Sequence, residues 1–368
     1  MALPLLDDYR QLFLDNIPLM DVRAPTEFVQ GAFPFAHNLP LMSDAERHLV
    51  GLRYKEAGQQ QAIKLGHELV QGNVKSSRVA DWVRFSEQHP QGALYCFRGG
   101  LRSLICQQWI FDATGVRYPR IKGGYKALRR FLIDELAVAA NQLQPVVLGG
   151  RTGSGKTRFL NQLQRQIDLE GIFHHRGSAF GKYASAQPSQ INIENQLAIK
   201  LLKFRQQHIT TVLLEDEAAS IGSRRVPNAI HEVMQRSPVV LLEVPFVERV
   251  ENIFDEYIHV ALAEHQQLHG EQAGFESWAS NLQQALANIE RRLGGQRYQE
   301  IRQIMNDALH QHRNLAQSEH HRQWIMRLLT DYYDPMYDYQ LDKKAERIVY
   351  RGEHDSLLAF LAQAYQVR

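Results

Sequence analysis

The chain has 368 residues, of which 44% are hydrophobic and 22% are charged. This composition excludes an intrinsically disordered chain, and the length predicts about two or three domains. Lys and Arg number 42 against 40 Asp and Glu, a formal charge of +2. Any nucleic-acid site must therefore be a local patch rather than a global excess of positive charge.

The two cysteines exclude a disulfide framework and a four-thiolate zinc site, and a reducing cytoplasm is the expected compartment. No signal peptide precedes Asp7 and Asp8. No apolar run approaches the roughly 20 residues that a membrane-spanning helix needs. We therefore expect a soluble cytoplasmic protein without a membrane partner.

The first part of the chain alternates expected strands and helices. Residues 17–23 form a short apolar strand, and Pro25 with Glu27 favours a helix start. A helix is expected over residues 44–70, a buried strand over 93–96, and a helix over 101–114 with apolar residues at helical spacing. Strands that alternate with helices indicate an α/β domain with a parallel sheet.

Cys96 ends one of these strands, and a Gly-rich loop leads from it to Arg102 at the start of the next helix. Such a loop directs backbone N–H groups at one point above the sulfur, and the helix N-terminus favours the thiolate. Arg102 can bind an oxyanion there. We predict Cys96 and Arg102 as catalytic residues, with Cys96 carrying sulfur or selenium or attacking phosphorus. A buried structural cysteine is the alternative, and it is the role expected for Cys106 on the apolar helix face.

No acidic residue occurs between Asp112 and Asp134, whereas six cations do. Clustered cations gain affinity for nucleic acid by releasing phosphate counterions, and Tyr118 and Tyr125 could stack on unpaired bases. The alternative is the solvated face of a helix. The predicted nucleic-acid residues are Arg117, Arg120, Lys122, Lys126, Arg129 and Arg130.

A complete P-loop pattern follows an expected linker over residues 141–145 and an apolar strand over 146–149. Its backbone N–H groups turn toward phosphate oxygens, Lys156 adds a charge, and the Thr157 hydroxyl can bind Mg²⁺. The helix after the loop is expected over residues 158–167. A Gly-rich turn that binds nothing is the alternative. The predicted phosphate-binding residues are Gly150, Gly153, Ser154, Gly155, Lys156 and Thr157.

Two further apolar strands are expected over residues 211–214 and 239–244. Glu215 and Asp216 follow the first of them, where a P-loop protein places its metal-binding carboxylate. We select Asp216, with Thr157, as the possible Mg²⁺ ligands; a solvated acidic turn is the alternative. Arg224 and Arg225 could clamp a diphosphate or be surface charges, and Arg224 is selected. From residue 247 the chain reads as helical, and the aromatic segment 332–339 is expected to anchor the C-terminal helix.

The motifs together resemble a known family. Residues 20–23 (Met-Asp-Val-Arg), Glu27, Gly31, residues 38–40, the Cys96 loop and residues 123–125 resemble a rhodanese domain. Joined to the P-loop and to residues 175–181, 187–190, 215–217 and 332–337, they resemble bacterial tRNA 2-selenouridine synthases over nearly the whole chain. The resemblance implies a rhodanese-like domain at 1–135, a P-loop NTPase-like α/β core at 136–246, and a helical C-terminal part at 247–368.

The resemblance implies that wobble 2-thiouridine of tRNA is converted to 2-selenouridine. The sulfur would first be alkylated from geranyl diphosphate, which makes it a better leaving group, and selenium from selenophosphate would then replace it. The P-loop would hold the prenyl diphosphate, and Cys96 matches the family's essential cysteine. The expected partners are the tRNA anticodon loop and a selenophosphate-supplying enzyme, with no stable protein partner, no tightly bound cofactor and possible Mg²⁺.

One departure from ordinary rhodaneses is that Arg102 follows Cys96 by six residues rather than five. The wider loop suits a tetrahedral group such as selenophosphate, and it keeps phosphatase chemistry open. Three rival functions therefore remain at this point. They are a P-loop kinase or ATPase with an attached rhodanese-type sulfurtransferase or sensor domain, a sulfurtransferase or phosphatase using Cys96 alone, and a non-enzymatic tRNA-binding module.

Overall fold

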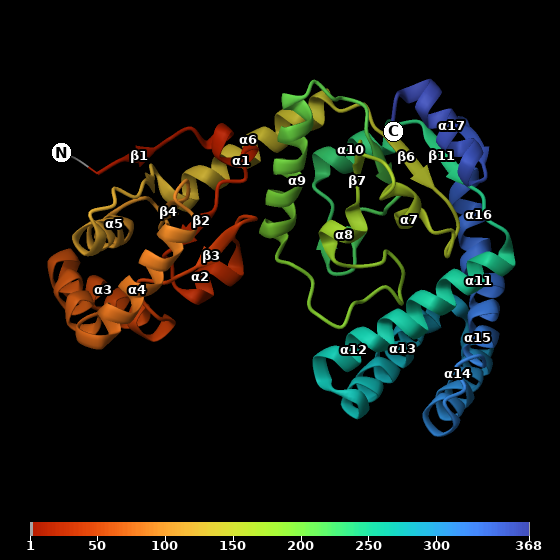
Figure 1. Cartoon of the computed structure of the whole chain (residues 1–368). Helices are drawn as coiled ribbons and strands as arrows, with labels where there is room; N and C mark the ends of the chain where they lie inside the picture. The colour runs from red at the N-terminus through yellow and green to blue at the C-terminus, as the bar shows by residue number, and fades with distance from the viewer. Residues whose placement is uncertain (1–2, 368) are drawn as a thin grey trace. The chain divides into compact units, whose positions relative to one another are not determined.

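In the computed structural model, which describes residues 3–367, the chain forms two units that each contain a five-stranded sheet (Figure 1). The first unit extends to Ala139 and also includes Ser189–Gln207. The second consists of Ala140–Pro188 and the chain from His208 onward. The strands pair in parallel within both sheets, as the alternation of strands and helices predicts.

The sheet of the first unit has the order β1-β5-β4-β2-β3. Its strands are β1 (Leu5–Leu6), β2 (Leu19–Asp21), β3 (Ala36–Asn38), β4 (Ala93–Tyr95) and β5 (Arg120–Ile121). The helices of this unit are α1 (Tyr9–Leu14), α2 (Pro25–Gln30), α3 (Asp44–Leu69), α4 (Gly72–Gln88), α5 (Leu101–Thr114), α6 (Gly124–Gln142, which continues into the second unit) and α9 (Gln190–Gln206).

Helix α9 belongs to the first unit, although its sequence falls within the expected P-loop domain at 136–246. Ala198, Ile199 and Leu202 share a core with Leu128 and Leu132 of α6. Since burial of such apolar surface is what stabilises a packed helix, α9 joins the unit whose core it completes.

The sheet of the second unit has the order β12-β11-β6-β8-β7. Its strands are β6 (Val146–Gly149), β7 (Gln166–Ile167), β8 (Leu213–Glu215), β11 (Val239–Leu242) and β12 (Ile348–Gly352), and β9 (Ser220–Ile221) pairs with β10 (Arg224–Arg225). The helices that accompany the sheet are α7 (Lys156–Leu160), α8 (Leu169–Phe173), α10 (Asn228–Arg236) and α17 (His354–Tyr365).

Two expectations for this unit are corrected. The helix after the P-loop ends at Leu160 instead of Ile167, because residues 166–167 form β7 and pair with β8. Strand β12 lies in the part expected to be helical, and it pairs with β11 at the edge of the sheet. The chain therefore returns to the sheet after its helical part.

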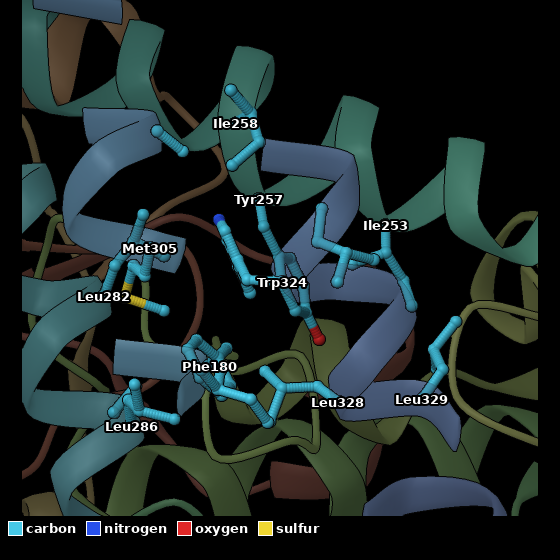
Figure 2. Packing of buried hydrophobic residues seen from close by; sticks show 14 of the residues in the cluster. Phe180, Ile253, Tyr257, Ile258, Leu282, Leu286, Met305, Trp324, Leu328 and Leu329 are labelled. Carbon is cyan, nitrogen blue, oxygen red and sulfur yellow. The ribbon is translucent and has the colours of Figure 1, made fainter. Parts of the chain in front are cut away.

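The helical part runs from α11 to α16 and has its own core (Figure 2). Phe180 lies 5.7 Å from Trp324 and 6.1 Å from Tyr257, measured between ring centroids. The elements of the helical part are α11 (Phe246–Phe254), η1 (Asp255–Val260), α12 (Ala261–His269), α13 (Glu271–Leu293), α14 (Gly295–Leu315), α15 (His321–Leu328), η2 (Leu329–Tyr333) and α16 (Asp334–Asp342). The short helix η3 (Ala345–Arg347) precedes β12. Within residues 3–367, no helix is long and apolar enough to cross a membrane.

Candidate functional site

The first candidate site is the loop between β4 and α5. It is held by the segment that begins α6, where the Tyr125 N–H donates to the Cys96 carbonyl at 2.9 Å and the Lys126 N–H donates to the Phe97 carbonyl at 3.0 Å. Gly124 must be glycine, because its φ is +59° and a Cβ there would lie 2.2 Å from the Cys96 carbonyl oxygen. The backbone around the sulfur is therefore fixed by a close approach of two segments.

Cys96 is 3% exposed at the base of this loop. Its Sγ donates to Ser103 Oγ at 3.2 Å, and that hydroxyl donates to the Gly100 carbonyl at 3.0 Å. Sequence reasoning missed Ser103, although it directly follows Arg102. Cys106 is fully buried in the same unit, and burial, followed by the nearby Cys96, raises the pKa of its thiol well above the ordinary value. The expected packing role of Cys106 is confirmed.

The Arg102 side chain is half-buried and paired with Glu27, the third residue of α2. Nη1 lies 2.6 Å from Glu27 Oε2, and Nη2 lies 3.2 Å from Oε1. Burial opposes both charges, but the hydrogen bond and opposite charge outweigh it, so the pKa of Glu27 is lowered and that of Arg102 is raised. Arg102 also interacts with the Cys96 sulfur. An anion entering the loop would therefore meet a guanidinium whose orientation is set by Glu27.

The cations between Asp112 and Asp134 divide into two groups. Arg117, Lys122, Lys126 and Arg130 are exposed. Arg120 is half-buried and donates to the Gly99 carbonyl and to Gln107 Oε1, so that it supports the cysteine loop. Arg129 is half-buried against Glu194 and Asn195.

Both tyrosines in this stretch are buried. Tyr118 is 1% exposed and donates to the His89 carbonyl at 3.0 Å, and Tyr125 packs against the Arg23 guanidinium at 3.8 Å. The hypothesis that they stack on bases is therefore wrong, because each ring already fills the core.

The second candidate site is the P-loop between β6 and α7. Gly153 has φ +82°, and a Cβ there would lie 2.6 Å from the Arg249 carbonyl oxygen. Asn252 Nδ2 donates to the Gly153 carbonyl at 2.9 Å, and Lys156 Nζ donates to the Gly150 carbonyl at 3.1 Å. The Ser154 hydroxyl oxygen is buried without a hydrogen-bond partner among residues 3–367. The loop thus keeps a polar group that a phosphate oxygen could satisfy.

Three glutamates lie at the end of the P-loop: Glu215, which is buried, and Glu170 and Glu217, which are half-buried. The Thr157 hydroxyl lies 2.8 Å from Glu170 Oε2 and 2.9 Å from Glu215 Oε1. Burial, and then repulsion by Glu170, raises the pKa of Glu215 well above its ordinary range and that of Glu217 to about 8. Burial lowers the pKa of Lys156, but Tyr337 and these glutamates outweigh it and raise that pKa.

Asp216 follows β8 and lies beside the start of the P-loop, where its N–H donates to the Leu148 carbonyl at 3.0 Å, whereas Arg224 lies in β10. Asp216 accepts from Lys344 Nζ at 2.7 and 2.6 Å, so the structure brings Thr157 together with Glu215 instead. Arg224 Nε donates to the Pro188 carbonyl at 2.8 Å. In residues 3–367, no group of three His, Cys, Asp or Glu side chains is arranged to hold a metal ion.

The helical part supplies residues to the P-loop that sequence reasoning missed. Arg249 donates to Asp334 through two hydrogen bonds of 2.8 Å and to the Thr152 carbonyl at 3.2 Å. Arg151 is paired with Asp338, and the Tyr337 ring centroid lies 6.0 Å from Lys156 Nζ. The aromatic segment 332–339 therefore contacts the P-loop, and its Tyr332 and Tyr333 pack in the core of the helical part. No signal in the sequence marks the contact, because Arg151 and Asp338 lie 187 residues apart.

The comparisons with known proteins agree on one family. Residues 143–367 match the family model described as tRNA 2-selenouridine synthase AAA domain. The chain is 51% identical to the tRNA 2-selenouridine synthase of Bordetella bronchiseptica over 354 residues, 96% of each chain. It is 52% identical to that of Pseudomonas putida W619, covering 94% of this chain and 95% of the relative, and 50% identical to that of Pseudomonas syringae pv. syringae, covering 98% of each.

Proposed function

The chain belongs to the tRNA 2-selenouridine synthase family, and from this premise we propose that it replaces the sulfur of wobble 2-thiouridine in tRNA by selenium. The reaction has two steps, S-geranylation from geranyl diphosphate and replacement of the geranylated sulfur by selenium from selenophosphate. The rhodanese-like first unit carries the second step and the P-loop unit carries the first. This division is supported by two loops that follow central strands, one with Cys96 and the half-buried Arg102 and one with Lys156 and the unsatisfied Ser154 hydroxyl.

In the first step the P-loop amides and Lys156 hold the diphosphate. The thiocarbonyl sulfur attacks C1 of the geranyl group, the C1–O bond breaks, and the electron pair leaves with diphosphate. Uracil N3 loses its proton, so the product is neutral S-geranyl-2-thiouridine. Lys156 stabilises the charge that develops on the departing diphosphate, and this is where a buried cation contributes most to rate.

Mg²⁺ would assist this step if it binds through Thr157 and one carboxylate together with diphosphate oxygens, since Mg²⁺ commonly takes one or two carboxylates plus phosphate. Glu215 suits this role better than Asp216, whose carboxylate is paired with Lys344. When bound, the ion would neutralise part of the charge on the diphosphate.

In the second step the Cys96 loop and Arg102 hold selenophosphate. Transfer of selenium itself to the Cys96 thiolate would leave the P–Se electron pair on phosphorus and reduce it to phosphite. Attack of the thiolate on phosphorus instead forms an S–P bond and releases selenide with that electron pair. Selenide then adds to C2 of the S-geranylated base, geranylthiolate leaves with a proton, and water releases phosphate from Cys96. This route balances without an added oxidant.

The anticodon loop of the tRNA is the proposed macromolecular partner, since it carries the wobble base. The exposed cations Arg117, Lys122, Lys126 and Arg130 would contact its phosphates, and the surface ion pairs of Lys122 with Asp7 and of Arg130 with Asp134 would open on binding. Arg120 and Arg129 would act by holding the protein surface in place, since each is bonded within its own unit.

The proposal is tested with Lys156→Ala in the full-length protein. Geranylation of 2-thiouridine tRNA is expected to fall at least 100-fold, whereas tRNA supplied already S-geranylated is still converted to 2-selenouridine. Arg158→Ala, which removes an exposed cation from the same helix, is the matched control and keeps both activities. Unimpaired geranylation by Lys156→Ala would overturn the assignment. Dependence of either step on ATP hydrolysis would favour the P-loop kinase or ATPase function instead.

A further inference from the structure

The first unit contains an apolar cavity of about 580 Å³ beside the cysteine loop. Its walls come from α3 and α5, and we refer to it as the α3–α5 cavity. The lining side chains are mostly apolar, with Trp109 half-buried on the α5 side. Representative lining residues are Leu41, Val50, Ala62, Ile63, Ile105 and Trp109. Its volume lies within the range of small-molecule sites, roughly 300–1,000 Å³.

The cavity exists because α3 is broken in the middle. Gly58 has φ +79° and ψ −179°, which divides the helix into two arms that both contribute to the lining. Gly51 lies on the first arm, where an added Cβ would meet no atom within 4 Å. Leu52 and Tyr54, also in the lining, are 41% and 57% exposed. Large apolar side chains that face open space indicate a surface that a ligand covers.

One end of the cavity meets the candidate catalytic loop. Leu101 and Arg102, the first residues of α5, belong to the lining, and Arg102 is the residue that interacts with Cys96 and pairs with Glu27. Arg47 and Lys55 add positive charge to the mostly apolar wall, which also includes His48, Gln59 and His67. A ligand that fits has a flexible hydrocarbon chain joined to a polar, reacting head and to phosphates.

We propose that the α3–α5 cavity binds the geranyl chain of S-geranyl-2-thiouridine while selenium is exchanged at the Cys96 loop. This inference rests on the proposed function and adds the residues that recognise the intermediate. The C2–S bond must break where selenium is delivered, so the geranyl chain has to lie beside Cys96 at that moment. A cavity whose lining includes Arg102 meets this requirement, and burial of the chain there would favour the geranylated base over 2-thiouridine.

The first test measures binding without catalysis. S-geranyl-2-thiouridine nucleoside is titrated into the full-length protein, and the fluorescence of Trp109 reports occupancy, with Trp109→Phe identifying its share of the signal. Leu52→Glu places a charge in the cavity wall and is expected to weaken binding at least tenfold. Leu49→Glu, on the same arm, 47% exposed and outside the lining, is the matched control and binds as the wild type does.

The second test measures the exchange itself with selenophosphate and anticodon stem-loops that carry either S-geranyl- or S-methyl-2-thiouridine. The wild type should favour the S-geranyl substrate. In Leu52→Glu this preference should fall at least tenfold, because KM for the S-geranyl substrate rises, while geranylation of 2-thiouridine stays unchanged. Normal nucleoside binding by Leu52→Glu, with equal losses on both substrates, would overturn the proposal. Binding of the nucleoside without any exchange in the wild type would contradict the proposed function and leave the cavity assignment standing.

Discussion

Glu217 belongs to the glutamate cluster at the end of the P-loop, and its pKa is shifted far above that of an ordinary glutamate. Burial, with repulsion from Glu170, raises its pKa to about 8, whereas a glutamate in an unfolded chain titrates near about 4.3. Between these values the folded protein holds a proton that the unfolded chain has lost. The free energy of unfolding therefore falls as pH rises from about 4.3 to about 8.

We predict that Glu217→Gln flattens this dependence. The amide keeps the size of the side chain and carries no charge, so the variant should resist unfolding better than the wild type at pH 8, by on the order of 1 kcal/mol, since one pKa unit corresponds to about 1.4 kcal/mol. Thermal unfolding between pH 6 and 8.5 measures the slope. Glu290→Gln, at an exposed position of α13, is the control, and an unchanged slope for Glu217→Gln would contradict the protonation assigned to it.

Some site residues follow from the sequence and others cannot. Cys96, Arg102 and the P-loop are contiguous motifs, and the Ser103 hydroxyl could have been found because it adjoins Arg102. Glu27 lies 75 residues from Arg102 and reaches it because β2 and β4 are neighbours in the sheet. Asp216, which the sequence suggests as a possible Mg²⁺ ligand, is paired with Lys344, a residue 128 positions away in the sequence. Partners of this kind depend on strand order, which a single sequence does not specify.

At the scale of elements, we expect His321 at the start of α15 to make the stability of the helical part depend on pH in the acid range. Its ring is fully buried. The Trp324 Nε1–H donates to His321 Nδ1 at 2.9 Å, and His321 Nε2 lies 3.2 Å from His312 Nδ1. Burial, and then the neighbouring histidines, lowers the pKa of His321 to about 3. Below about pH 6.5 the unfolded chain takes up a proton that the folded protein excludes, so stability is lost as pH falls.

We predict that His321→Gln reduces this loss between pH 6.5 and 4, because one proton fewer is taken up on unfolding. The glutamine oxygen can still accept from Trp324, which limits the cost of the substitution. Tryptophan fluorescence during urea unfolding at several pH values measures the slope. His310→Gln, which changes an exposed histidine of α14, should retain the wild-type slope, and a wild-type slope in His321→Gln would refute the assignment.

Elements with strong local signals could be predicted from the sequence. The expected helix over residues 101–114 and strand over 146–149 agree with α5 and β6. The helix after the P-loop was predicted too long because β7 has only two residues and gains its identity from pairing with β8. Strand β12 was missed because it is a partly exposed edge strand within a polar, helical region. Tertiary pairing decides such segments more than local propensity.

At the scale of the whole molecule, the net charge of +2 does not reveal the two loops that we propose to bind anions. Each unit supplies a parallel sheet, a loop at the end of a central strand and a helix that follows it. Ligands of α/β folds bind at such strand ends. We propose that the two loops perform successive steps on one base, with an S-geranylated intermediate between them.

The most direct measurement is mass spectrometry of nucleosides from 2-thiouridine tRNA treated with the Cys96→Ala protein, geranyl diphosphate and selenophosphate. Geranylation continues at the P-loop and exchange stops, so S-geranyl-2-thiouridine should accumulate and 2-selenouridine should be absent. Cys106→Ala, which alters the buried cysteine of α5, should still yield 2-selenouridine. Recovery of unmodified 2-thiouridine from the Cys96→Ala reaction, or of 2-selenouridine at the wild-type level, would contradict the division of the two steps.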